Sequence, residues 1–278
     1  MVGQERLLKQ LKRLIQKNKF PRFSIFCGQE GSGKKKVFQY IVEQFNDNQN
    51  STEEVIATIY GKTVEDVRQL IADSNKLAGT KHICLIPDAD TMSVQAKNAL
   101  LKLTEEPPAN AYIVMTLVDT NNTLDTIRSR ATTFLMQPYL PSQLMEYMQL
   151  KEYEEKSINV CDACETPGEI DLLYEYDVDE FYEFVKKTVD NIATVNGANV
   201  FKLTDKIKLK EEGAGYDLKL FLKLFIKVCY DRFVETDEDH YMKGVLITSN
   251  YLKDLRIKGI SKSGVIDLWI LDIRKEWM

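Results

Sequence analysis

The sequence is poor in the residues that bind metals or form disulfides. Among its 278 residues there are five cysteines and two histidines. The odd number of cysteines argues against a disulfide framework, because such a framework pairs its cysteines. Cys161 and Cys164, in the stretch CDAC, have the spacing of half a zinc site, but no second pair is present. Two thiols on one helical face explain this stretch better than a metal or redox site, and we expect no bound metal.

Long hydrophobic runs and an excess of positive charge are also missing. The longest apolar run, AYIVMTLV at 111–118, suits a buried strand and is too short to cross a membrane. The first residues do not form a charged and then apolar leader. These features predict a cytoplasmic protein without a membrane anchor. The formal net charge of −5 provides no overall basic field, so any contact with nucleic acid has to be local.

Two local groups of basic residues are candidates for such a contact. Lys12, Arg13 and Lys17 fall on an early predicted helix. Lys97 and Lys102 fall on a later one. Side chains of this type bind the phosphate backbone of nucleic acids, but they also form ordinary solvated helix faces. The sequence leaves both interpretations open.

The first half of the chain alternates short apolar runs with amphipathic helical patterns. A parallel sheet covered by helices on both faces is typical of this alternation. Ser93 can cap one of the helices, and Pro107 and Pro108 end it. Strands are expected at 23–27, 55–60, 82–86, 111–118 and 132–136, and helices at 5–17, from 34 onward, at 65–78 and at 94–105. After about residue 138 the pattern changes to short helices, and after about residue 178 to longer amphipathic ones.

The stretch CGQEGSGKKKV, residues 27–37, lies between a predicted strand and a predicted helix and contains the pattern G-x-x-x-x-G-K. Gly28, Gly31 and Gly33 allow backbone N–H groups to turn inward around phosphate oxygens, and the helix adds the positive end of its dipole. Lys34 would reach the outer phosphates. We interpret this stretch as a phosphate-binding loop rather than a glycine-rich turn of an unrelated α/β domain.

A working ATPase also needs Mg²⁺, held by a Ser or Thr hydroxyl after the loop lysine and by an Asp at the end of a later strand. This sequence has Lys35 at the first position and Pro87 at the second, and neither side chain offers an oxygen. Asp88 could replace Pro87 only if the strand slipped by one residue, which would turn its side chains to the other face. We therefore expect a degenerate loop that holds ATP or ADP without Mg²⁺, if it holds a nucleotide, and no hydrolysis by this chain alone.

Residues 88–130 closely resemble the corresponding stretch of bacterial DNA polymerase III clamp-loader subunits. These are AAA+ proteins that open a sliding clamp and place it on primed DNA. The most specific parts are AKNALLKLTEEPP at 96–108 and TIRSR at 126–130. VGQE at 2–5 is similar to the opening Gly-Gln box of the family, and VNGANVFKLTDKIK at 195–208 resembles its delta-prime members in particular.

The resemblance implies roles for individual residues. Arg130, preceded by Ser129, matches the arginine finger that reaches the γ-phosphate bound by a neighbouring subunit. Thr116 matches the position that senses this phosphate, and Asp88 matches the acidic residue that orients the attacking water. Gly168 replaces the arginine that hydrolysing members carry on their sensor helix. Without metal ligands, the resemblance implies that Thr116 and Asp88 are relics or structural residues.

The resemblance also implies an architecture and a function. The expected parts are an AAA+ P-loop base domain with a parallel sheet at 1–137, a small helical lid at 138–177 and an all-α collar for oligomerisation at 178–278. The implied partners are an ATPase subunit, a clamp-opening subunit, the sliding clamp and primed DNA. The implied function is that of a non-hydrolysing, delta-prime-like subunit that donates Arg130. The residues also leave open an active AAA+ ATPase of DNA metabolism and a static nucleotide-binding module. The zinc module of many family members is missing from the short interval 46–54, so zinc is not expected.

Overall fold

The computed structural model describes residues 1–278 except 49–52, 77–79, 155, 157–159, 194–214 and 256–260. The chain divides into two compact units, residues 1–143 and 144–278. The finer boundaries of base, lid and collar at 137/138 and 177/178 stay a prediction. The segment 195–208, on which the delta-prime resemblance partly depended, lies outside the described residues.

The first unit is built around a five-stranded parallel sheet with the strand order β2-β3-β4-β1-β5. Strands β1 and β4 are buried along their whole length, as expected for parallel strands covered on both faces. The strands are β1 (Phe23–Cys27), β2 (Glu54–Ile59), β3 (Thr80–Ile86), β4 (Ala111–Leu117) and β5 (Thr132–Leu135). The five strands predicted from the sequence are therefore confirmed.

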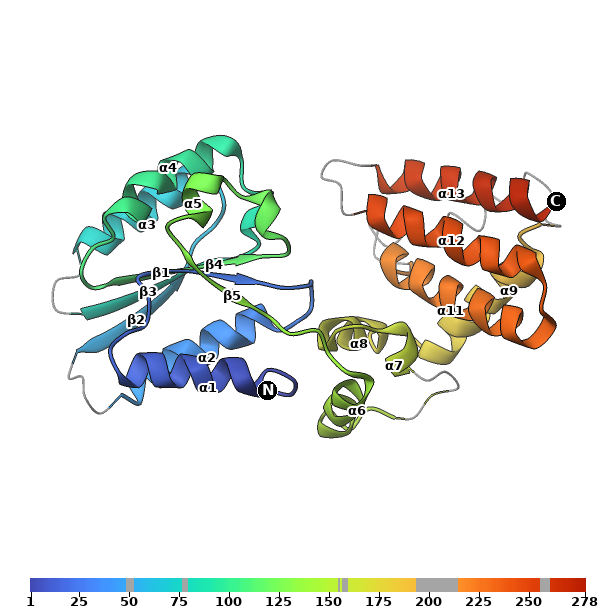
Figure 1. Ribbon diagram of the computed structural model, residues 1–278, viewed down its shortest axis with the longest axis horizontal. Coiled ribbons are helices and arrows are strands. Elements are labelled where there is room, and N and C mark those ends of the chain that lie inside the picture. The colour runs from blue at the N-terminus through green and yellow to red at the C-terminus, as the bar shows by residue number, and fades with distance from the viewer. Residues whose placement is uncertain (49–52, 77–79, 155, 157–159, 194–214, 256–260) are drawn as a thin grey trace. The chain divides into compact units, whose positions relative to one another are not determined.

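Helices cover both faces of this sheet (Figure 1). Successive side chains of β1 show why, because Ile25 packs into the cluster on one face and Phe26 into the cluster on the other. Ser93 caps one helix as predicted, since its Oγ accepts the Ala96 N–H at 3.2 Å. One face carries α1 (Glu5–Gln16) and α2 (Lys34–Asn46), and the other carries α3 (Val64–Lys76), α4 (Val94–Glu105) and α5 (Asp125–Arg128).

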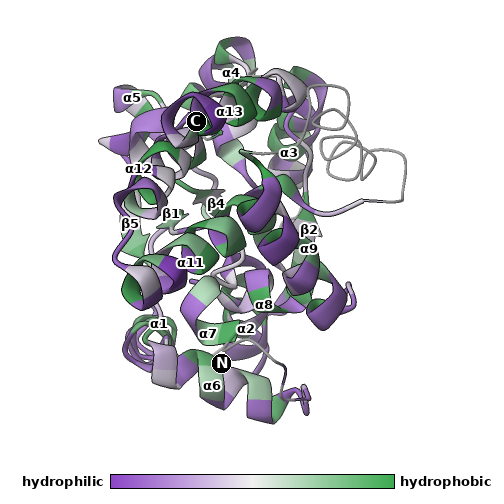
Figure 2. Cartoon of the chain, turned by 90° about the vertical axis from the view of Figure 1, so that its right-hand side faces the viewer, coloured by the Kyte–Doolittle hydropathy of each residue, from purple (hydrophilic) through white to green (hydrophobic). Residues whose placement is uncertain are grey.

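The second unit is helical in its described parts. Trp269 is fully buried at its centre, with ring-edge contacts to Phe221 and Phe225 at centroid distances of 5.6 and 4.8 Å. The indole Nε1 of Trp269 donates to Thr248 Oγ1 at 3.0 Å, so its polar atom is satisfied inside the core. Hydrophobic residues run along much of α11 (Figure 2). The described helices are α6 (Pro141–Leu150), whose first three residues belong to the first unit, α7 (Val160–Ala163), α8 (Pro167–Leu173), α9 (Val178–Asn191), α11 (Leu218–Thr236), α12 (Asp239–Asp254) and α13 (Lys262–Trp277).

The structure bears on two features that the sequence argued against, a metal site at the CDAC stretch and a membrane-spanning helix. Cys161 and Cys164 are both buried free thiols, and burial raises the pKa of Cys164 to about 12. A thiol with so high a pKa is a poor metal ligand and a poor nucleophile at neutral pH. In the described parts of the chain, no helix combines the length and apolar character needed to cross a membrane.

Candidate functional site

The candidate site lies at the carboxyl ends of the central strands. Because the strands are parallel, the residues that follow β1, β3 and β4 meet at the same edge of the sheet. Gly28 follows β1, Pro87 follows β3 and Val118 follows β4. The Gly28 N–H donates to Leu117 O at 3.0 Å, which joins the start of the loop to the end of β4. The loop then runs to Gly33, where α2 begins.

The predicted loop glycines have physical reasons to be glycine. Gly31 and Gly33 have φ values of +76° and +89°, in the left-handed region that side chains disfavour. A Cβ on Gly28 would lie 2.5 Å from the Cβ of Met136, closer than two non-bonded carbon atoms approach. The three glycines thus allow the tight turn that brings β1 into α2, as the loop pattern predicted.

The lysine of the loop is engaged by the loop itself. Lys34 Nζ donates to the backbone oxygens of Gly28 at 2.6 Å and Gln29 at 2.9 Å. Its side chain is buried, and this burial lowers the pKa of Lys34 despite the opposing charges of Asp88 and Asp90. The ammonium group therefore stabilises the folded loop, and it would have to leave two carbonyls in order to reach a phosphate.

The described residues around the loop do not fit a magnesium ion. Lys35 is exposed and places a second positive charge at the start of α2. Asp88 has a left-handed backbone with φ +49°, and its N–H donates to Thr116 Oγ1 at 2.9 Å. Asp90 uses its carboxylate to accept the N–H groups of Val118 and Asp119. Thr116 and Asp90 thus fasten the ends of β3 and β4 together, which gives both a structural role.

The same loop retains features that fit a phosphate group. No side chain caps α2, because its N-cap residue is Gly33, so first-turn N–H groups remain for an anion. Ser32 Oγ is buried and has no hydrogen-bond partner among the described residues. Tyr139 Oη donates to Ser32 O at 2.8 Å and fixes the loop from the outside. The chemistry of the loop therefore admits phosphate oxygens, although Lys34 must first be released.

Arg130 lies at an exposed position just after α5. Its guanidinium donates to Glu105 Oε1 at 2.8 Å and to Thr126 O at 2.6 Å. About a third of the side chain remains exposed, at 34%. Ser129 is the C-cap residue of α5, and its Oγ donates to Thr126 O at 3.2 Å. The guanidinium has five N–H donors in a planar fork, so donors remain available to a further anion.

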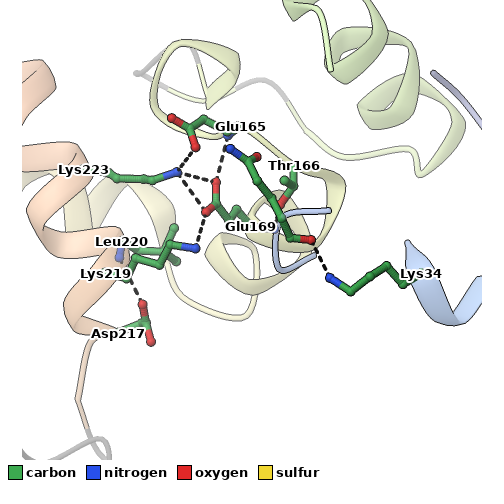
Figure 3. A network of polar contacts seen from close by, with 9 residues as sticks. Lys34, Glu165, Thr166, Glu169, Asp217, Lys219, Leu220 and Lys223 are labelled. Atoms are coloured by element: carbon green, nitrogen blue, oxygen red, sulfur yellow. Dashed lines mark hydrogen bonds and ion pairs between the residues drawn. The ribbon is translucent and has the colours of Figure 1, made fainter. Parts of the chain in front are cut away.

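The helix expected to carry the sensor residue is α8. Gly168 contributes no side chain there. Its neighbour Glu169 is buried, and its carboxylate pairs with ammonium groups of α11 (Figure 3). Lys219 Nζ lies 2.9 Å and Lys223 Nζ 2.8 Å from the Glu169 carboxylate. Burial alone would raise the pKa of Glu169, but these two lysines lower it below its ordinary value. Lys223 also pairs with Glu165 at 3.0 Å.

Sequence reasoning missed this network around Glu169. Two local signals were present, the capping pattern of Thr166 and Glu169 and the spacing of Lys219 and Lys223 by one helical turn. Neither signal shows that the two pairs meet, because α8 ends at Leu173 and α11 begins only at Leu218.

The basic residues predicted as candidates for nucleic-acid contact differ in their exposure to solvent. Lys97 is buried, and its Nζ donates to Asn122 O inside the first unit. Lys102 on the same helix is exposed, as are Lys12, Arg13 and Lys17 on α1. Lys97 is therefore a structural residue, and the other four side chains are accessible.

The chain is similar in sequence to subunits of DNA polymerase III. Residues 56–139 match the family model described as DNA polymerase III, delta subunit. The delta' subunit of DNA polymerase III from Bacillus subtilis is 26% identical over 163 residues, which are 51% of this chain and 50% of that protein. The tau subunit from the same organism is 26% identical over 156 residues, 48% of this chain and 28% of that protein. The chain thus spans half or less of the length of these curated relatives.

Solved structures support the fold. A gamma subunit-related protein of DNA polymerase III from Thermotoga maritima has a TM-score of 0.52 at 18% identity, covering 98% of this chain and 99% of that chain. The Aeropyrum pernix Orc1 protein, solved in complex with DNA, has a TM-score of 0.52 at 12% identity, covering 100% of this chain and 84% of that chain. The parallel sheet, the loop before α2 and the helical second unit give the chain a fold of the AAA+ P-loop type. Within that class the chain is a relative of the DNA polymerase III clamp-loader subunits, which confirms the resemblance inferred from the sequence.

Proposed function

We propose that this chain is a delta-prime-like, non-hydrolysing subunit of a DNA polymerase III clamp loader that donates Arg130 to the ATPase site of a neighbouring subunit. One observation carries the proposal: the loop has a lysine at the magnesium-ligand position, while Arg130 is held at the surface with donors to spare. A guanidinium stabilises the negative charge that develops on a phosphoryl group during transfer. The chain would thus contribute to a reaction centred on another subunit's nucleotide.

The proposed partners are the other clamp-loader subunits, the sliding clamp and primed DNA. Exposed leucines on the second unit support a collar that packs against other subunits, since Leu246 of α12 and Leu268 and Leu271 of α13 are each more than half exposed. Cytoplasmic location and the absence of catalysis by the isolated chain belong to the same proposal.

Reconstitution of the complex tests the finger. The chain is combined with the ATPase and clamp-opening subunits of its own organism, and ATP turnover is measured with wild-type protein and with Arg130→Ala. We expect turnover at the one neighbouring site to fall by roughly 10²–10⁵-fold in the variant, as for other arginine fingers. Arg128→Ala is the matched control, because Arg128 is an exposed arginine at the end of α5, two residues before Arg130, and it pairs with Asp125 at 2.7 Å. Equal rates for wild type and Arg130→Ala at that site would reject the role, as would Mg²⁺-dependent turnover by the chain alone.

A second candidate function is static binding of ATP or ADP without Mg²⁺. It is favoured by the unpartnered Ser32 hydroxyl and by the uncapped start of α2. Calorimetric titration with ATP in the presence of EDTA tests it. Saturable binding that is lost on Lys34→Met, with an unchanged circular dichroism spectrum, would support this candidate, and an absence of heat in wild type would reject it.

A further inference from the structure

A buried polar network joins the edge strand β2 to β3 and to α3. His82 of β3 lies at its centre and is 1% exposed. The Nε2 atom of His82 lies 3.0 Å from Thr58 Oγ1 on β2 and 3.4 Å from Tyr60 Oη, just after β2. The Tyr60 hydroxyl also donates to Asp73 Oδ2 on α3 at 3.2 Å. We call these four residues, Thr58, Tyr60, Asp73 and His82, the His82 network.

The sheet geometry places the network inside the core. Thr58 pairs with Cys84 in the register of β2 and β3, and His82 lies two residues before Cys84 on the same side of the strand. Helix α3 covers this face of the sheet (Figure 1). Tyr60 and Cys84 belong to the apolar cluster on the same face. The polar atoms of the network are therefore enclosed by apolar side chains.

One nitrogen of the buried imidazole has no partner. His82 Nδ1 is buried and makes no hydrogen bond with any residue that the structure describes. In the neutral ring only one nitrogen carries a hydrogen, and Nε2 can donate it to Thr58 Oγ1. Protonation adds a hydrogen to the other nitrogen, and Nδ1–H is then a buried donor without an acceptor. Because such a group is costly, the closed network favours neutral His82.

The negative charge nearest to this imidazole is that of Asp73, and it is shared with other donors. Its carboxylate accepts hydrogen bonds from Tyr60 Oη and from Gln69 Nε2. The charge of Asp73 favours a protonated ring, but burial outweighs it and lowers the pKa of His82 below the ordinary histidine value. Geometry and electrostatics thus agree that the folded chain holds His82 neutral.

The other neighbours of His82 do not change their charge in the range where an imidazole titrates. Strand β4 places Ala111 beside it. Lys81, the preceding residue of β3, lies on the other face of the sheet. Burial raises the pKa of Cys84 to about 12 and also raises the pKa of Tyr60. Tyr60 and Cys84 therefore stay neutral between pH 5 and pH 8, where histidine ordinarily titrates.

We infer that the His82 network is an acid-sensitive lock, which holds β2 and α3 against β3 while His82 is neutral and releases them when its ring is protonated. Strand β2 is suited to such release, because it lies at the edge of the sheet and pairs with β3 alone among the described strands. In the released state water reaches both ring nitrogens, so the imidazolium no longer lacks an acceptor.

The direction of the pH dependence follows from linkage. The ring binds a proton more readily in the released state than in the closed state, because its pKa is lowered only when the network is closed. The lock is at full strength above the ordinary histidine value of about 6.5. It weakens as the pH falls from that value toward the lower pKa of the closed state.

This lock is separate from the proposed arginine finger. The strand order β2-β3-β4-β1-β5 places β2 at one edge of the sheet, whereas Arg130 precedes β5 at the other edge. The phosphate loop follows β1, which is separated from β2 by two strands. The inference therefore does not rest on the proposed function, and the two can fail separately.

The first experiment measures the charge state of His82 in the full chain. The sequence contains two histidines, His82 and His240, so NMR of histidine-labelled protein gives two ring signals. The variant His240→Gln leaves only the signal of His82. We expect this signal to titrate at a lower pH in the folded chain than in the same chain unfolded in urea, where histidine titrates at about 6.5. An equal or higher midpoint in the folded chain would overturn the inference.

The second experiment measures release by hydrogen exchange with mass spectrometry, at pH 7 and pH 5, after correction for the intrinsic effect of pH on exchange. In wild type we expect opening of β2 and α3 to be more frequent by roughly fivefold or more at pH 5, and opening of β1 and β4 to change by less than about twofold. His82→Gln and His82→Phe remove the titrating ring and should abolish the difference between the two pH values. His240→Gln is the matched control and should retain it.

Three results of the exchange experiment would overturn the inference. The first is equal opening of β2 at pH 7 and pH 5 in wild type. The second is a pH dependence that persists in a folded His82 variant. The third is an equal response of β1 and β4, which would mean that acid loosens the whole unit instead of its edge. Circular dichroism at pH 7 shows which variants fold, and if neither His82 variant folds, the titration and the wild-type exchange decide the question.

Discussion

The carboxylate of Glu105, at the end of α4, holds the guanidinium of Arg130, just after α5, at a distance of 2.8 Å. The two side chains are 50% and 34% exposed, so the pair lies in a solvent-rich environment. Exposed pairs of this kind contribute little to stability, typically about 0–1 kcal/mol. The contact fixes the direction of the guanidinium more than it stabilises the domain.

Glu105→Gln should therefore affect function more than folding. We expect a decrease of roughly tenfold in the partner's ATP turnover, since a finger without its positioning contact spends less time in the productive geometry. The free energy of unfolding, measured with urea, should change by less than about 1 kcal/mol. Asp125→Asn is the control, because it removes the neighbouring exposed pair with Arg128 and leaves Arg130 untouched. A turnover as fast as that of wild type would argue against a positioning role for Glu105.

Lys35→Thr should not restore ATP hydrolysis. The substitution supplies the hydroxyl that a magnesium site needs beside the loop, but Pro87 still offers no oxygen at the end of β3. We expect turnover by the purified variant to stay at the background of the wild-type chain in a coupled ATPase assay with Mg²⁺. Substantial activity in the single variant would mean that Asp88 can serve as the second ligand after all.

Thr116→Val should destabilise the first unit. Thr116 is 1% exposed, and its Oγ accepts the N–H of Asp88, whose backbone is held at positive φ. Valine has a similar shape but leaves this N–H without its acceptor, at a cost of about 1–3 kcal/mol. Urea unfolding of wild type, Thr116→Val and Thr116→Ser measures the effect. Thr116→Ser keeps the hydroxyl and should lose less unfolding free energy than Thr116→Val. Equal losses of unfolding free energy in the two variants would contradict a role for the hydrogen bond.

Glu169→Gln should destabilise the chain in a pH-dependent way. The pKa of Glu169 is lowered in the folded state, so its charge stabilises the fold above the unfolded value of about 4.3. That contribution is lost as the pH falls through the lower, folded pKa. We expect Glu169→Gln to cost about 1–3 kcal/mol at pH 7, because Lys219 and Lys223 lose their shared anion.

The difference in unfolding free energy between wild type and Glu169→Gln should shrink when the pH is lowered below about 4. Chemical denaturation at pH 7, 5, 4 and 3 follows this trend. Glu175→Gln, at an exposed position that follows α8, serves as the control and should leave stability nearly unchanged at every pH. A constant difference from pH 7 to pH 3 would show that the Glu169 charge does not contribute as proposed.

The sequence predicted the elements of the first unit well because their signals are local. The apolar run 23–27 was enough to place β1, and Ser93 before a helical pattern was enough to place the start of α4. The glycines of the loop were also predictable, since their backbone requirement follows from the strand-to-helix turn itself.

The polar contacts of the site could not be predicted in the same way. Nothing in the sequence shows that Lys34 bonds to the carbonyls of Gly28 and Gln29, because a charged side chain can reach outward or fold back within one loop. The burial of Lys97 and the ion pair of Glu169 with Lys223 depend on the packing of segments that are distant along the chain. Such contacts are decided by tertiary structure, and single-residue patterns do not encode them.

The position of β1 in the sheet has a consequence for biosynthesis. This strand, which leads into the phosphate loop, hydrogen-bonds only with β4 and β5, and both are translated more than eighty residues after it. Until the ribosome has released β4, which ends at Leu117, both edges of β1 are open, and the edge toward β5 stays open until about residue 135. During this time the nascent segment must avoid pairing with other chains. The strand that shapes the loop is thus among the first to be made and among the last to acquire its neighbours.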